Sequence, residues 1–171
     1  MYRKTVFYPV IDRSTIPGLA LCGVWFAGVS LGLLAACFYG GSVGALALTA
    51  GRTEPTFFGC CVATVLPLFL SAFAVFLFHR TGAYFVSALR GFILGYTLGC
   101  VTAVGGIWLG LLLLFSAVAV SPVLLWFLWR RLSLGSDCVW RDLLYAFLAA
   151  LAICAVDFRA VAPFLAHALS F

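Results

Sequence analysis

Four long stretches without a charged residue limit what this chain can fold into more than any other feature. They cover residues 14–51, 55–78, 91–129 and 143–156. Hydrophobic residues make up 65% of the chain and charged residues 9%, which is more apolar side chain than a soluble domain of 171 residues can hide. The sequence therefore predicts an integral membrane protein and disfavours an unusually hydrophobic soluble helical protein.

The lengths of these stretches predict how often the chain crosses the membrane. A spanning helix needs about 20 mostly apolar residues to cross about 30 Å of hydrocarbon. A β-barrel is disfavoured because the stretches are continuously apolar and lack a period of two. The third stretch is too long for one span, and Gly105–Gly106 and Ser121–Pro122 interrupt it. We expect a single all-α transmembrane domain, a five-span helical bundle with spans at about 17–39, 57–78, 83–104, 107–128 and 143–163.

The positions of the basic residues predict the orientation of the bundle. With five spans and a cytoplasmic N-terminus, the outer side carries two basic residues, Arg52 and Arg159. The cytoplasmic side then carries eight, which are Arg3, Lys4, Arg13, Arg80, Arg90, Arg130, Arg131 and Arg141. If the third stretch is counted as one span, the chain has four spans, with six basic residues on the cytoplasmic side and four outside. The positive-inside rule therefore favours five spans. The predicted topology anchors are Arg80, Arg90, Arg130 and Arg131, and Arg90 is expected to snorkel to the headgroups.

Neither a cleaved signal peptide nor a nucleic-acid-binding surface is expected from this composition. The first span follows basic residues as a signal peptide does, but it is longer than a typical apolar core of such a peptide, so we expect no cleavage. The net charge of +5 follows from the cytoplasmic bias alone. No soluble basic surface is predicted, and we therefore expect the lipid bilayer and not nucleic acid as a partner.

The sequence shows no pattern that predicts catalysis. It contains no H-E-x-x-H motif, no opposed pair of intramembrane aspartates and no Gly-rich phosphate loop between a strand and a helix. Six of the seven cysteines fall in or near apolar helix without a C-x-x-C motif, and neither histidine has a cysteine at ligand spacing. We expect no enzyme activity, no cofactor and no metal site.

A row of glycines follows Arg90. Gly91, Gly95 and Gly99 share one helix face, and Gly106 and Gly110 repeat the spacing in the next span. Small residues four apart let another helix backbone approach closely in a membrane. The spacing predicts a tight antiparallel hairpin of the third and fourth spans, with packing on a partner protein as the alternative.

Two ionisable residues lie in the outer third of the last span. Asp157 and Arg159 are two positions apart, so they do not face each other on a helix. They are either interfacial residues that reach the headgroups or candidates for partner contact. Pro163 is expected to kink or end the helix beyond them.

Three segments together resemble the stage II sporulation protein M family. "LRGFILGYTLG" (Leu89–Gly99) is similar to the family's basic-Gly-Phe-x-x-Gly-aromatic-x-x-Gly stretch. The next span has a proline past its midpoint, Pro122, and the last carries an acid followed by a proline, Asp157 and Pro163. The resemblance covers roughly residue 55 to the C-terminus. The chain departs from the family in its closing Asp, where Glu is usual, and in a short first connection at 40–56.

The resemblance implies a multi-pass scaffold in the bacterial cytoplasmic membrane. In spore formers such a protein acts in engulfment and recruits the stage II sporulation proteins D and P, which degrade septal peptidoglycan. It implies no catalytic residue. The glycine row would then serve close helix contact, and Asp157 with Arg159 would contact partners outside. The alternative is a small-solute transporter or a membrane subunit of a transport system, with broken helices at Gly105–Gly106 and Ser121–Pro122.

Overall fold

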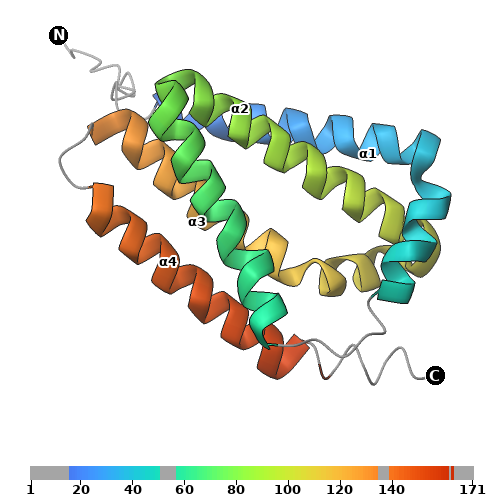
Figure 1. The fold of residues 1–171 in the computed structure, drawn as a ribbon. Helices are drawn as coiled ribbons and strands as arrows, with labels where there is room; N and C mark the ends of the chain where they lie inside the picture. The colour runs from blue at the N-terminus through green and yellow to red at the C-terminus, as the bar shows by residue number, and fades with distance from the viewer. Residues whose placement is uncertain (1–15, 51–56, 135–138, 162, 164–171) are drawn as a thin grey trace, which may run out of the picture.

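The computed structural model describes residues 16–50, 57–134, 139–161 and 163 (Figure 1). Those residues are helical except at Leu114 and contain no strand, which confirms the all-helical prediction. The elements are α1 (Ile16–Ala50), α2 (Phe57–Leu113), α3 (Phe115–Leu134), α4 (Val139–Val156) and the π-helix η1 (Asp157–Val161).

Helix α2 reverses its direction at His79. The backbone there has φ 50° and ψ −126°, which is not helical, and Figure 1 shows the chain turning back on itself. A straight helix over residues 57–103 would be about 70 Å long, more than twice the thickness of the hydrocarbon layer. The reversal divides it into a first arm, residues 57–78, and a second arm, residues 80–103. These two arms correspond to the predicted second and third spans.

A second break lies at Gly106, where the sequence predicts one. Gly106 has φ 80°, a left-handed conformation that glycine adopts without strain. Beyond this break, the helical segments Gly106–Leu112 and Ala117–Ser133 are bent by 58° relative to each other.

The predicted interruption at Ser121–Pro122 is wrong, because α3 continues through both residues. Pro122 lacks the N–H that would bond the carbonyl of Val118, and α3 continues without that bond. The hydroxyl of Ser121 donates to a different carbonyl, that of Ala117, at 2.9 Å.

The ends of the helices differ from the predicted bounds. Helix α1 continues beyond the predicted residue 39 to Ala50, and α4 begins at Val139, before the predicted start. The last helix widens into η1 just before Pro163. Proline lacks a backbone N–H, and its ring crowds the carbonyl of the residue four positions earlier. A π turn at this place accommodates that ring, which gives the expected kink a specific form.

Several helices are long and apolar enough to cross a membrane. Three stretches meet this condition: Ile16–Phe38, Phe57–Ala103 and Trp140–Val161. The bent pair around Leu114 counts as a fourth when its halves are taken as one span. The outer surface carries large apolar side chains, such as Phe58 at 77% exposure and Phe76 at 73%. Such a surface suits contact with lipid and not with water.

The hydrophobic core forms where all four α-helices meet. Leu21 of α1, Leu68 of the first arm and Ala83 of the second arm are buried in it. Helix α3 contributes Phe127 and α4 contributes Ala146. Figure 1 shows that the start of α1, the reversal of α2, the end of α3 and the start of α4 all lie at one end of the bundle. The start of α2 and η1 lie together at the other end, where Phe57 packs against Phe158.

Candidate functional site

The glycine row of the second arm packs against α1. A Cβ atom added to Gly91 would overlap the carbonyl oxygen of Trp25, and one added to Gly95 would overlap that of Val29. At Gly99 the added atom would lie 2.5 Å from the Cβ of Ala36. The residue numbers rise together along both helices, so they run parallel. The predicted antiparallel hairpin with the fourth span is therefore wrong for these three glycines, because α1 covers their face.

Helix α1 supplies the matching row of small residues. Gly28, Gly32 and Ala36 are four positions apart. A Cβ atom added to Gly28 would overlap the carbonyl oxygen of Ala88, and one added to Gly32 would overlap that of Phe92. The two backbones are therefore in direct contact along two turns of each helix. The spacing of this row in the sequence indicates a second surface for close helix contact. Our sequence-based prediction did not include this row.

A buried hydrogen bond extends the same interface. The hydroxyl of Ser87 on the second arm donates to the carbonyl of Leu21 on α1 at 3.1 Å. Both residues are fully buried. Hydrogen bonds between helices add to small-residue packing in membranes. We refer to this contact together with both small-residue rows as the glycine clamp.

The other two glycines of the predicted row have different roles. Gly106 forms the break, and a Cβ atom added there would meet nothing within 4 Å. A Cβ atom added to Gly110 would lie 2.8 Å from Cγ2 of Thr102 and 3.2 Å from Cδ1 of Leu98. Gly110 thus packs on the second arm, where the predicted hairpin would place it. One glycine, and not five, makes the predicted contact.

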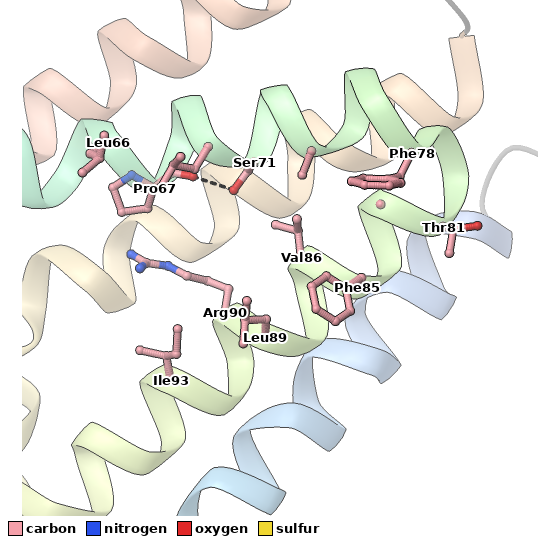
Figure 2. A pocket seen from close by; sticks show the side chains of 13 residues that line it. Leu66, Pro67, Ser71, Phe78, Thr81, Phe85, Val86, Leu89, Arg90 and Ile93 are labelled. Atoms are coloured by element: carbon pink, nitrogen blue, oxygen red, sulfur yellow. Dashed lines mark hydrogen bonds between the residues drawn. The ribbon is translucent and has the colours of Figure 1, made fainter.

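A cavity opens between the two arms of α2. Its volume is about 590 Å³, and apolar side chains form most of its wall. Figure 2 shows the guanidinium of Arg90 extending from the second arm toward Pro67 of the first arm. The group points away from the reversal, near which Phe78 and Thr81 lie. The side chain thus lies in the cavity and does not reach back toward the reversal, as the expected snorkelling to headgroups at that end of the helix would require.

The charge of Arg90 has no partner among the described residues. Its side chain is half-buried, and it makes no hydrogen bond or ion pair within that part of the chain. The hydroxyl of Ser71 also lines the cavity, but it donates to the carbonyl of Pro67 at 2.5 Å. Arginine keeps its positive charge in proteins and presents up to five N–H donors. These donors face an apolar space.

Arg130, predicted as a topology anchor, has a structural partner. Its Nε atom donates to Oδ2 of Asp142 at 2.9 Å, and its guanidinium carbon lies 5.5 Å from the centre of the Trp126 ring. Asp142 is buried, and its Oδ1 atom has no hydrogen-bond partner in the described structure. Arg131, also a predicted anchor, is half-buried and interacts with its surroundings. Arg80 is exposed beside the reversal.

Asp157 and Arg159 lie in η1, at the end of α4 that is remote from Asp142. Asp157 is half-buried and interacts with its surroundings, whereas Arg159 is exposed. Between them, the ring of Phe158 packs edge-on against that of Phe57 at 5.5 Å, which holds η1 against the start of α2. The pair is therefore part of a fixed helix end, with the arginine on its surface.

Two of the cysteines that the sequence places in or near apolar helix lie side by side. The sulfur atoms of Cys61 in the first arm and Cys154 in α4 are 3.5 Å apart. Among the described residues, no group of three or more His, Cys, Asp or Glu could hold a metal ion.

Comparison with known proteins adds no relative to this description. No protein-family model, curated protein or solved structure matches the chain.

Proposed function

We propose that this chain is a multi-pass membrane scaffold that organises peptidoglycan-remodelling proteins, as its resemblance to the stage II sporulation protein M family implies. It crosses the bacterial cytoplasmic membrane five times, with its N-terminus inside. The crossings are α1, the two arms of α2, the broken pair around Leu114, and α4 with η1. The partners are other membrane or cell-wall proteins, including the stage II sporulation proteins D and P if the source organism sporulates.

The parallel packing of α1 and the second arm supports this topology. Two parallel spans must cross the membrane in the same direction, as the first and third spans of a five-span chain do. The helix ends that carry Arg80, Arg130, Arg131 and Arg141 lie at one end of the bundle (Figure 1). Arg159 belongs to the other end. This separation agrees with the positive-inside rule for a cytoplasmic N-terminus.

The glycine clamp is the observation that carries the scaffold proposal. Direct contact between two backbones leaves α1 little freedom to slide or rotate on the second arm, because any side chain in the way would have to be displaced. A frame of this kind holds its helix ends at fixed positions. The glycines of the clamp pack two helices of the same chain against each other. They therefore do not form the surface that meets a partner.

The partner surface is then the outer helix end at η1. Arg159 is exposed there, and Phe158 holds η1 in place against Phe57. Enzymes that cut the cell wall act outside the membrane, so only the outer ends of the spans can meet their extracellular parts. A charged, exposed side chain on a fixed helix end is suited to that contact.

Photo-crosslinking from two positions of the last span tests the proposal. A photoreactive residue replaces Arg159 in one variant and Leu148 in the control. Leu148 is exposed on the same helix and is expected to face lipid. We expect position 159, and not 148, to crosslink to a wall-remodelling protein in cells of the source organism. The scaffold proposal fails if position 159 gives no protein adduct, or gives the same adducts as position 148.

One observation favours transport as a second candidate. The 58° bend around Leu114 and the left-handed Gly106 form a broken helix of the kind that lines transport sites. The break lies here and not at Pro122. Purified chain in proteoliposomes would then take up a solute from a panel, and Gly106→Ala would reduce that uptake. Absence of uptake for every solute in the panel would exclude transport by the chain alone.

A further inference from the structure

The cavity between the arms of α2 combines one cation with apolar walls. Among the described residues that line it, Arg90 carries the only charge, and Ser71 and Thr81 carry the only side-chain hydroxyls. A charge in apolar surroundings is costly unless it is paired. Neither acid among the described residues pairs with Arg90. Asp142 binds Arg130, and Asp157 lies in η1, beside the start of α2. Arg90 is therefore left without a counter-ion among the described residues.

The cavity opens onto the outer apolar surface of the bundle. Several of its lining residues are themselves exposed, including Leu70 at 59% and Phe85 at 66%. In a membrane, this surface contacts acyl chains. A ligand that enters between the arms from the bilayer must therefore have an apolar chain as well as an acidic group. The volume of about 590 Å³ lies within the range of pockets that enclose small organic ligands.

The position of Arg90 along the second arm restricts the acid further. Arg90 is ten residues beyond Arg80, which is about 15 Å along a helix and about half of the hydrocarbon thickness. A phospholipid would have to draw its phosphate, its glycerol and a second chain out of the headgroup layer to reach this depth. A single-chain acid has only one carboxyl group to bring. One carboxylate also balances one guanidinium, whose planar fork matches its two oxygens.

We propose that this cavity binds a long-chain carboxylic acid, with its carboxylate on the guanidinium of Arg90 and its chain against the apolar walls of the two arms. This inference does not depend on the scaffold role, because it concerns the space between the two arms of α2 and not Arg159 of η1. It assigns Arg90 a ligand in place of the topological role that its charge suggests.

Binding of palmitate to the purified full-length chain in phosphatidylcholine nanodiscs tests this proposal. We expect saturable binding of one palmitate per chain, weakened at least about tenfold by Arg90→Gln, which removes a charge-assisted contact. Arg90→Lys keeps the charge and should retain part of the affinity. Arg80→Gln is the matched control, because it removes an exposed arginine of the same helix, and it should bind as the unchanged chain does. Hexadecanol, which has the chain without the acid, should bind at least about tenfold more weakly.

A second variant covers the case in which Arg90→Gln does not fold. Leu70→Trp enlarges an exposed side chain at the cavity wall and leaves Arg90 in place. We expect this variant to fold and to lose palmitate binding because its ring occupies the cavity. The proposal is overturned if palmitate binds equally to the unchanged chain, Arg90→Gln and Leu70→Trp. It is also overturned if phosphatidylglycerol displaces palmitate at equal concentration, because the site would then prefer a two-chain phosphate lipid.

Discussion

The Nε atom of Arg130 lies 2.9 Å from Oδ2 of Asp142, which joins the end of α3 to the start of α4. The Asp142 side chain is 6% exposed, so the carboxylate depends on this partner for most of its stabilisation. Residues 135–138, between the two helices, lie outside the described residues. The ion pair therefore fixes the crossing of the two helices independently of the connection.

Removal of Arg130 alone should destabilise the fold. We expect Arg130→Gln to lower the free energy of unfolding by about 2–3 kcal/mol, because it leaves a buried carboxylate without its cation. The double variant Arg130→Gln with Asp142→Asn should recover most of this loss. Thermal unfolding in detergent, followed by tryptophan fluorescence, measures both. Equal losses in the single and double variants would show that the pair contributes nothing as a pair.

The glycine clamp predicts that substitution of alanine destabilises the fold at Gly95 but not at Gly23. Gly95→Ala places a methyl group on the backbone of Val29 and should cost about 1–3 kcal/mol. Gly23→Ala is the control in α1, because an added Cβ atom there meets nothing within 4 Å. It should leave the stability unchanged or raise it by up to about 1 kcal/mol, since alanine favours helix. A Gly95→Ala variant as stable as Gly23→Ala would contradict the contact with α1.

Much of this fold follows from the sequence because apolar length and helix-breaking residues are local properties. They predict helices, the division of α2 near His79 and the break at Gly106. The partner of the Gly91 row is harder to predict, because a row of small residues indicates only that some backbone comes close. The matching spacing of Gly28, Gly32 and Ala36 is the one signal in the sequence that indicates α1 as that partner.

The Arg90 cavity is also a property of the folded chain. It exists because the two arms diverge from the reversal at His79, and no local sequence pattern encodes that angle. The charge of Arg90 is visible in the sequence, but the direction of its side chain depends on the space between the arms. The Arg130–Asp142 pair was missed because both residues fall between the predicted spans 107–128 and 143–163, whereas α3 continues to Leu134 and α4 begins at Val139.

The reversal at His79 predicts a stabilising substitution. His79 has φ 50°, which is unfavourable for any residue with a Cβ atom, and its side chain is exposed. His79→Gly should raise the free energy of unfolding by about 1 kcal/mol or more, because glycine adopts this conformation at low cost. His79→Ala removes the imidazole but keeps the Cβ atom, so no such gain is expected from it. Equal stabilities of the two variants would exclude backbone strain at this position.

The sulfur atoms of Cys61 and Cys154 predict a specific crosslink between α2 and α4. They are 3.5 Å apart, so a small movement brings them to the bonding distance of about 2.05 Å. Mild oxidation should form this disulfide within one chain, and mass spectrometry of unreduced peptides should detect it. Cys22 and Cys37 are exposed on α1 and serve as internal controls, which should stay unlinked to Cys154. Failure to crosslink Cys61 would contradict the packing of the first arm on α4.

The most direct test of the proposed architecture is a labelling experiment that shows on which side of the membrane each helix end lies. Single cysteines replace Arg80, Arg141 and Arg159, one at a time, in a chain whose native cysteines are changed to serine. These three side chains are exposed, and their removal leaves the Arg130–Asp142 pair in place. An impermeant maleimide is applied to intact cells and to inverted membranes. We predict that positions 80 and 141 are labelled only from the cytoplasmic side and position 159 only from outside. Labelling of positions 80 and 141 from opposite sides would contradict the five-span topology.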